Sequence, residues 1–190
     1  SDETVDLITG QELARPGEVL PAVIHLLPVT SRPFFPGQAV PLLMELEHWA
    51  PTMKAVEASG HGILGIVLAD AKTSETARPV DFHKIGTACR VHRVQPVEGR
   101  LQVLVECLQR FRIDKVQEKK APFSARVHYF QEPAETAKGE IKPYAMAVIN
   151  TIKELVPLNP LYGEELRMFL DRLGPDDPSH LADFAASLTT

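Results

Sequence analysis

The chain has 190 residues, a formal net charge of −5, and hydrophobic and charged fractions of 44% and 24%. These values are typical of a soluble globular protein with one or two domains and a sizeable core. No apolar run approaches the roughly 18 residues of a transmembrane helix, and the acidic N-terminus lacks the basic and apolar regions of a secretory signal. The two cysteines are too few for a disulfide framework, so we expect no membrane association and a cytoplasmic location with free thiols.

The charge is distributed unevenly along the chain. Residues 71–130 carry 12 Lys/Arg and 6 Asp/Glu, whereas both flanking segments are acidic. Because the basic residues follow strand alternation, the pattern favours the solvent-facing side of a sheet. The alternative is a nucleic-acid or polyphosphate binding module that uses this basic 71–130 segment. Its candidate residues are Arg90, Arg110, Arg112, Lys119 and Lys120. The acidic total and the lack of aromatic residues interleaved with these bases argue against it.

The N-terminal region is rich in proline. Residues 1–20 are polar, and we expect a flexible N-terminal arm there. From Pro21 to Met44 the sequence is apolar but interrupted by prolines, which cannot donate a hydrogen bond to a β-ladder. This pattern predicts short or edge strands joined by fixed turns, with the clearest turn at Pro36-Gly37.

One helix and one buried strand are predicted next. Apolar residues at helical spacing predict a helix of about three turns over residues 50–59, with Pro51 in its first turn and Gly60 as its stop. The spaced residues are Trp49, Met53 and Val56. The apolar run Ile63–Leu68 is short enough to be a buried strand. The letters GHGILG at residues 60–65 match G-x-G-x-x-G, but the helix precedes and the strand follows, which is the reverse of a dinucleotide site.

The following segment predicts a long β-hairpin. Residues 85–94 and 101–113 alternate between apolar and polar residues, which is the pattern of strands with one solvent-exposed face. Ile85, Cys89 and Val91 are expected to point inward. A three-residue loop over 97–99 would place Cys89 opposite Cys107. One more strand is predicted over residues 123–130.

After Glu132 the spacing of apolar residues becomes helical. Helices are predicted over 141–155, 166–173 and 181–188, the last one starting at Asp177-Pro178. The apolar positions that define them are Ile141, Ala145, Val148, Ile149, Ile152 and Leu155, then Leu166, Phe169, Leu170 and Leu173, then Leu181, Phe184, Ala185 and Leu188. A β-rich part with one helix, followed by a run of helices, is an α+β fold.

No catalytic, cofactor-binding or metal site is expected. The nucleophile-elbow, zinc-protease and P-loop motifs are absent from the sequence. Cys89 and His92 are three positions apart on one strand, so their side chains face opposite sides of the sheet. Buried thiols are therefore favoured over a zinc site. Arg110 and Arg112 share one face at a strand end. We expect them to be solvent-facing charges, with polar contacts to a subunit or a substrate as the alternative.

Five segments, in this order and spacing, resemble segments of a known protein family. They are LPVTSRPFFPGQAVPLLM at 27–44, ILGIVL at 63–68, DFHKIGTACRV at 81–91, LQVLVECLQRFRI at 101–113 and DDPSHLADFAASL at 176–188. The most specific marks are Pro28, Pro36, Pro41, Ile85-Gly86-Thr87 and Arg110-x-Arg112-Ile113. Over residues 22–190 the chain resembles the N-terminal domain of Lon, the ATP-dependent bacterial protease. The family usually carries glycine at the position of Cys107, which in a strand suggests a bulge or a close backbone approach.

The resemblance implies a fold and a function. The fold is a PUA-like β pseudobarrel with one packed helix over residues 21–132, followed by a three-helix subdomain over residues 133–190. The function is recognition and positioning of unfolded or degron-bearing protein substrates for an unfoldase ring and a serine peptidase elsewhere in the parent protein. The fragment itself is expected to be non-catalytic and without cofactors, whereas the parent uses ATP and Mg and forms a homohexamer. We expect the isolated fragment to be a monomer or weak dimer, and a stand-alone Lon-type domain protein is the remaining alternative.

A receptor for unfolded chains needs a modest exposed apolar surface. The candidate substrate-binding residues are Phe34, Phe35 and Pro36. Neighbouring aromatic residues in a run that cannot pair regularly do not easily both point inward. The alternative is that both aromatic side chains belong to the core or to a domain contact.

Overall fold

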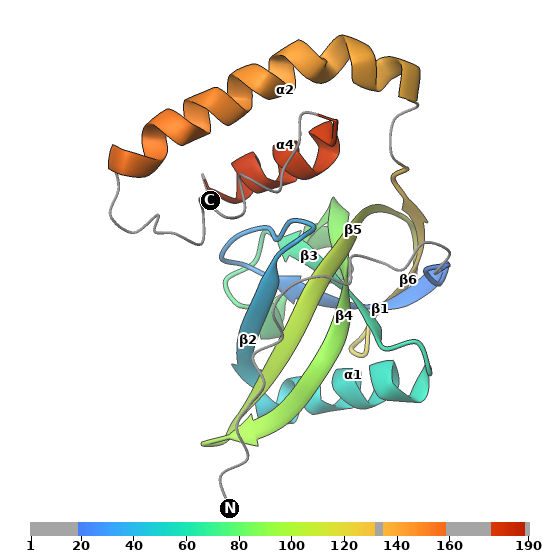
Figure 1. The fold of residues 1–190 in the computed structure, drawn as a ribbon. Helices are drawn as coiled ribbons and strands as arrows, with labels where there is room; N and C mark the ends of the chain where they lie inside the picture. Colours follow the sequence, from blue (N-terminus) through green and yellow to red (C-terminus); the bar gives the residue numbers. More distant parts are fainter. Residues whose placement is uncertain (1–18, 132–134, 159–175, 189–190) are drawn as a thin grey trace, which may run out of the picture.

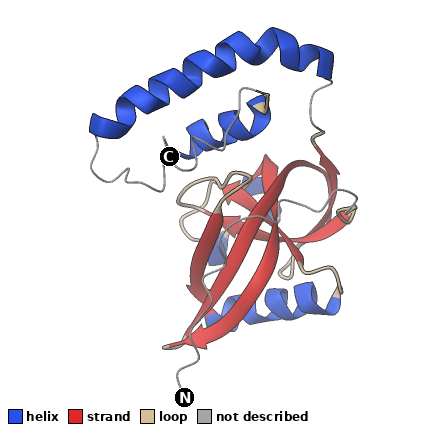
Figure 2. Cartoon of the chain, viewed as in Figure 1, coloured by secondary structure: helices blue, strands red, loops and turns tan. Residues whose placement is uncertain are grey.

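The computed structural model describes residues 19–131, 135–158 and 176–188, and these form a β-rich part followed by helices (Figures 1 and 2). The strands are β1 (Val23–Val29), β2 (Ala39–Glu45), β3 (Ile63–Ala69), β4 (Phe82–Val97), β5 (Arg100–Glu118) and β6 (Ser124–Tyr129). The helices are α1 (Leu46–Ala58), α2 (Glu135–Leu155) and α4 (Pro178–Ser187), with short 3₁₀ turns at Ser74–Thr76, Pro79–Asp81 and Val156–Leu158. The order of elements confirms the predicted α+β class.

The six strands form one sheet that closes on itself. The strand order is β2-β5-β4-β3-β1-β6, and β5 also pairs with β6. Closure is possible because β5 is long: residues 100–106 pair with β2, and residues 111–118 pair with β6. Only β1 and β3 run parallel. The strand β2 remains at the edge of the sheet, where Pro41 costs no ladder hydrogen bond to a second neighbour. The predicted β pseudobarrel is confirmed.

The hairpin of β4 and β5 turns more tightly than expected. Its loop has two residues, Glu98 and Gly99, with φ angles of 49° and 77°. Positive φ at both positions matches a tight hairpin turn with the twist of the sheet. The expected three-residue loop is therefore wrong, yet Cys89 does lie opposite Cys107. The register is restored by a bulge, because β4 carries one extra residue at His92.

A second bulge changes which side chains face inward. Ala88 pairs with Gln109 and Cys89 pairs with Cys107, so Leu108 is an extra residue on β5. Beyond this bulge, each residue of β4 lies opposite a β5 residue one position further along the chain than the pairing of Cys89 with Cys107 would give. Ile85 pairs with Arg112 and is 47% exposed. It lies in an irregular stretch of the β3–β4 ladder, because Val67 pairs with Gly86 and Ala69 with Phe82, so that residues 83–85 oppose Leu68 alone. The prediction that Ile85 points inward was wrong, because the regular alternation does not extend through this stretch.

The helix α1 begins earlier than its apolar spacing suggested. The carboxylate of Glu45 accepts hydrogen bonds from the backbone N–H groups of Glu47 (3.2 Å) and His48 (2.7 Å), and this caps the helix at Leu46. Pro51 therefore lies inside the helix and not in its first turn. The predicted stop is confirmed, because Gly60 has a φ of 77° after the C-cap. Trp49, Met53 and Val56 are all buried, as predicted, and join the barrel core.

The described helices of the C-terminal part form a separate small core. Ala145, Ile149 and Ile152 of α2 pack with Leu181 of α4, and Phe184, Ala185 and Leu188 pack at its margin. The helix α2 begins at Glu135, before the predicted start. Its buried face is narrower than expected, because the side chains of Ile141, Val148 and Leu155 are exposed. Asp177 caps α4 as predicted, with its carboxylate accepting from the His180 N–H at 3.3 Å. The helix predicted over 166–173 lies outside the described residues.

In Figure 1 α2 and α4 lie at one end of the molecule and α1 lies at the other. No helix within the described ranges combines the length and the apolarity that crossing a membrane requires.

Candidate functional site

A shallow apolar groove opens on the barrel beside Phe35, and we name it the Phe35 groove. Its volume is about 310 Å³. It is lined by Pro33, Phe34, Phe35, Ile66, Leu68, His83, Lys84, Ile85, Gly86, Thr87 and Arg110. The walls therefore come from the segment after β1, from β3, from the start of β4 and from the middle of β5. Two predicted site residues that are far apart in the sequence, Phe35 and Arg110, meet in it.

The two adjacent phenylalanines face different environments. Phe34 is 9% exposed and packs in the barrel core, and its carbonyl accepts a hydrogen bond from Thr87 Oγ1 at 2.6 Å. Phe35 is half-buried, and its backbone N–H donates to Gln38 Oε1 at 2.9 Å. Pro36 is buried. Of the three predicted substrate-binding residues, Phe35 thus offers the most accessible side chain, and the binding role of all three stays a prediction.

The opposite wall comes from the start of β4. Ile85 lies there in the irregular stretch opposite Leu68, and its side chain lines the groove. Gly86 follows it and also lines the groove. The sequence did not identify Ile85 as a site residue, because strict alternation placed it in the core. The apolar pattern of the sequence carries no mark of the irregular stretch between residues 82 and 86.

The two candidate arginines have different surroundings. Arg110 Nε lies 3.3 Å from Asp183 Oδ1, so this side chain joins the barrel to α4. Asp183 is buried, whereas Arg110 is about half exposed. Arg112 Nη2 lies 3.3 Å from Asp114 Oδ1, and both of these side chains are exposed. Arg112 matches the expected solvent-facing charge, whereas Arg110 lies at a contact between elements and on the rim of the Phe35 groove.

The basic segment is partly neutralised within the fold. Arg110 and Arg112 each lie beside a carboxylate. Arg90 pairs in the ladder with Glu106 and has further contacts of its own. Lys119 and Lys120 are exposed after the end of β5. This pairing lowers the positive potential available to a polyanion, which weakens the alternative of nucleic-acid or polyphosphate binding.

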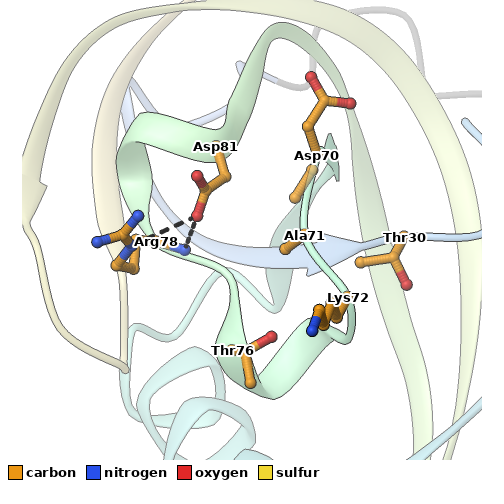
Figure 3. Close-up of a pocket in the computed structure, with 8 residues that line it drawn as sticks. Thr30, Asp70, Ala71, Lys72, Thr76, Arg78 and Asp81 are labelled. Atoms are coloured by element: carbon orange, nitrogen blue, oxygen red, sulfur yellow. Dashed lines mark hydrogen bonds and ion pairs between the residues drawn. The ribbon is translucent and has the colours of Figure 1, made fainter.

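A larger polar hollow of about 660 Å³ lies beside the loop after β3 (Figure 3). Its lining includes Asp70, Lys72, Arg78 and Asp81. Asp81 Oδ2 accepts the Arg78 N–H at 2.9 Å and lies 3.6 Å from Arg78 Nε, which closes the short turn Pro79–Asp81. In Figure 3 the carboxylate of Asp70 points away from Lys72. Asp70 Oδ1 lies 3.1 Å from His83 Nε2 of β4, so the two carboxylates of this hollow have separate partners and do not converge on a common point.

A third hollow, of about 570 Å³, lies between α1 and the β4–β5 hairpin. Its apolar lining includes Met53, Val91 and Val94. Its rim carries the pair His92 Nε2–Glu106 Oε2 at 2.8 Å. It is an alternative apolar surface, but it brings together none of the residues that the sequence selected.

Comparisons with known proteins identify the family. The family model for the ATP-dependent protease La (LON) substrate-binding domain matches residues 23–190. Lon protease 2 of Hydrogenovibrio crunogenus is 41% identical over 181 residues, which cover 95% of this chain and 21% of that protein. Lon protease of Protochlamydia amoebophila is 36% identical over 193 residues, covering 100% of this chain and 23% of that protein. The chain thus spans about a fifth of the length of these relatives.

A solved structure supports the fold. The N-terminal domain of the Mycobacterium avium complex Lon protease superposes with a TM-score of 0.59 at 20% sequence identity. The match covers 86% of this chain and 81% of that one. The sequence matches and the shared pseudobarrel agree, and the chain belongs to the ATP-dependent protease La (LON) substrate-binding domain family.

Proposed function

We propose that this chain recognises and positions unfolded or degron-bearing polypeptides for a Lon-like ATP-dependent serine protease, and that the Phe35 groove holds them. The observation that carries this proposal is the presence of partly exposed Phe35 and Ile85 on opposite walls of one apolar groove. Cleavage and the use of ATP and Mg belong to other parts of the parent protein, whose subunits form a homohexamer. The chain itself acts without catalysis.

The groove suits an extended segment better than a folded surface. Unfolded chains present isolated apolar side chains, which gain free energy when they leave water. A volume of about 310 Å³ is at the lower limit of ligand pockets, so it accommodates a short apolar stretch. Because its walls include β-strands of a closed barrel, the surface is formed before the client arrives and little ordering entropy is lost.

The rim of the groove gives the proposed client a charge preference. His83, Lys84 and Arg110 line the groove, and carboxylates lie beside two of them, Asp70 beside His83 and Asp183 beside Arg110. The distance from His83 Nε2 to Asp70 Oδ1 is 3.1 Å. Lys84 is exposed and adds positive charge at the rim. Apolar segments next to acidic residues are therefore the preferred clients, because complementary charges favour association and suppress the wrong partners.

Binding to a permanently unfolded probe tests the proposal. A reduced and carboxymethylated protein, or a labelled apolar peptide with acidic flanks, is titrated with the chain and followed by fluorescence anisotropy. Phe35→Ala and Ile85→Ser should each weaken binding about tenfold, since each removes apolar area worth roughly 1–2 kcal/mol. Lys84→Glu should weaken binding to the acidic peptide more than binding to a neutral peptide of the same apolar sequence.

Substitutions at two exposed valines outside the Phe35 groove serve as matched controls. Val80 is 81% exposed and lies outside the groove, and Val94 lies in the hollow between α1 and the hairpin. Val80→Ser and Val94→Ser should leave the affinity unchanged. Unchanged affinity in folded Phe35→Ala and Ile85→Ser variants would remove the groove from the mechanism. Loss of binding in Val94→Ser alone would move the site to the hollow beside α1.

A further inference from the structure

The two cysteines of the chain meet inside the barrel. Cys89 of β4 and Cys107 of β5 are direct partners in the ladder, and their Sγ atoms are 3.4 Å apart. Both are free thiols and are buried in the core. The client-recognition proposal uses neither of them.

The register of β4 against β5 places Cys89 and Cys107 in the type of antiparallel pair whose side chains lie closest together. The N–H of Cys107 donates to the carbonyl of Gln38 at 2.8 Å, and its carbonyl accepts from the N–H of Gly37 at 2.9 Å. Both backbone groups of Cys107 are therefore directed toward the segment before β2 and away from β4. Cys89 and Cys107 thus form a non-hydrogen-bonded antiparallel pair, for which Cα atoms lie about 4.5 Å apart. Disulfides span Cα distances of about 4.4–6.8 Å, so the backbone is already within range.

We propose that Cys89 and Cys107 are a dithiol modification site that closes to an intrachain disulfide when it meets a low-molecular-weight disulfide oxidant. One thiolate attacks the oxidant R–S–S–R, forms a mixed disulfide and releases the first RS⁻. The second cysteine then attacks the protein sulfur of the mixed disulfide and releases the second RS⁻. One S–S bond of the oxidant is exchanged for one in the protein. Two electrons pass to the oxidant, and the two thiol protons are taken up by the released thiolates or by solvent.

Burial sets the rate of this reaction. Burial, followed by the hydrogen bond with Cys107, raises the pKa of the Cys89 thiol well above its usual range. The reactive thiolate is therefore scarce in the closed hairpin, and the oxidant reaches it only when the hairpin opens locally. The same burial protects the finished bond from reductants. The bond should form readily during folding and then persist in the folded chain.

The bond should also stabilise the chain. It closes a loop that includes the whole tip of the β4–β5 hairpin, and closing such a loop reduces the freedom of the unfolded state. It also lies next to the bulge at Leu108 in the β4–β5 ladder. Fixing Cys89 against Cys107 holds this register without requiring movement of the surface residues.

Refolding in the presence of oxidised glutathione tests the proposal. Mass spectrometry of the refolded chain should show the loss of two hydrogen masses, and a non-reducing peptide map should link residues 89 and 107. Circular dichroism should match that of the reduced chain, and Tm should rise by about 5 °C or more. Oxidation of the already folded chain should be slow and should accelerate in low urea.

A matched variant tests the register itself. Val105→Cys combined with Cys107→Ala keeps two inward cysteines on the same strands, but diagonal neighbours lie about 7–8 Å apart, beyond disulfide range. This variant should remain unbridged under the same conditions. The proposal is overturned if the native chain refolds with both thiols free or glutathionylated, or if the bridged chain loses its fold or has a lower Tm. Equal bridging in the diagonal variant would overturn it as well.

Discussion

The interior of the barrel is arranged around the ring of Phe111. This side chain is fully buried, and its strand neighbour across the ladder is Gly86. A Cβ atom built on Gly86 would lie 2.6 Å from Phe111 Cζ, and one on Gly65 would lie 2.9 Å from the same atom. The ring thus occupies the space that side chains at these two glycines would need. Glycine at both positions lets an aromatic residue fill the barrel.

The two glycines should differ in their tolerance of alanine. At Gly86 the added Cβ would also lie 2.6 Å from the carbonyl oxygen of Ile66, and this backbone atom cannot move without distorting the β3–β4 ladder. At Gly65 the close atoms are side-chain ends of Ile24, Leu26 and Phe111, which can rotate. We expect Gly86→Ala to lower the unfolding free energy by about 3 kcal/mol and Gly65→Ala by about 1 kcal/mol.

Urea unfolding of both variants measures the difference. Adding Phe111→Leu as a background should recover part of the loss in Gly65→Ala, because the shorter side chain frees space. It should recover little in Gly86→Ala, where the backbone contact remains. Equal losses for the two glycines would show that the barrel backbone yields as easily as its side chains.

At the level of elements, the short pairing of β1 with β6 is reinforced by a side chain. Only residues 23–25 of β1 pair with β6. Tyr129 of β6 donates its hydroxyl hydrogen to the carbonyl of Pro21 at 2.8 Å, just before β1 begins. Burial raises the pKa of Tyr129 to about 12 from an ordinary value of 10. The neutral phenol is therefore favoured by the folded state.

Tyr129→Phe should lower the unfolding free energy near neutral pH by about 1 kcal/mol, the usual contribution of one hydrogen bond. Because the folded pKa lies above the unfolded pKa, the contribution of Tyr129 is fully present below pH 10. It is lost as the pH rises from 10 to about 12, since the unfolded chain gives up its proton first. Chemical unfolding across pH 8–12 should show a smaller alkaline decline in this variant. Tyr144→Phe, at an exposed tyrosine of α2, should leave the unfolding free energy near neutral pH unchanged.

The helices and strands were predictable where the apolar residues keep one regular spacing throughout a segment. Leu101, Val103, Val105 and Cys107 alternate inward as expected, and residues 141–155 lie in a helix. The sequence patterns failed where an extra residue or a polar cap intervenes. The bulges at His92 and Leu108 shift alternation without any mark in the apolar pattern. Glu45 starts α1 with a long carboxylate, which is not among the common N-cap residues.

At the scale of the whole molecule, the site could be predicted only in part. The run around Phe34 and Phe35 was selected because proline prevents regular pairing, and the structure places Phe35 at a groove. The opposite wall could not be foreseen, because Ile85 lies where the β3–β4 ladder is irregular and strict alternation does not apply. The partner of Arg110 could not be foreseen either. Asp183 comes from a helix 73 positions later in the chain, and no local pattern relates the two residues.

The ion pair between Arg110 and Asp183 is a contact by which the barrel holds α4. Arg110→Ala would remove the cation that lies beside the buried carboxylate of Asp183, and breaking an ion pair of a buried charge is costly. We expect a loss of about 1–3 kcal/mol in unfolding free energy, reduced from the fully buried case because Arg110 is 44% exposed at its side chain. Amide hydrogen exchange should accelerate in residues 178–187 before it accelerates in the barrel.

Arg112→Ala is the matched control, on the same strand and with an exposed carboxylate partner. It should cost no more than about 0.5 kcal/mol and leave exchange in α4 unchanged, as is usual for surface pairs. A double-mutant cycle of Arg110→Ala with Asp183→Asn separates the pairwise coupling from the cost of each single change. If Arg110→Ala and Arg112→Ala proved equally mild, with amide exchange in α4 equally slow in both variants, the ion pair with Asp183 would contribute little to holding α4. In that case Arg110 would act only at the rim of the Phe35 groove, and its effect would appear in client binding without any change in stability.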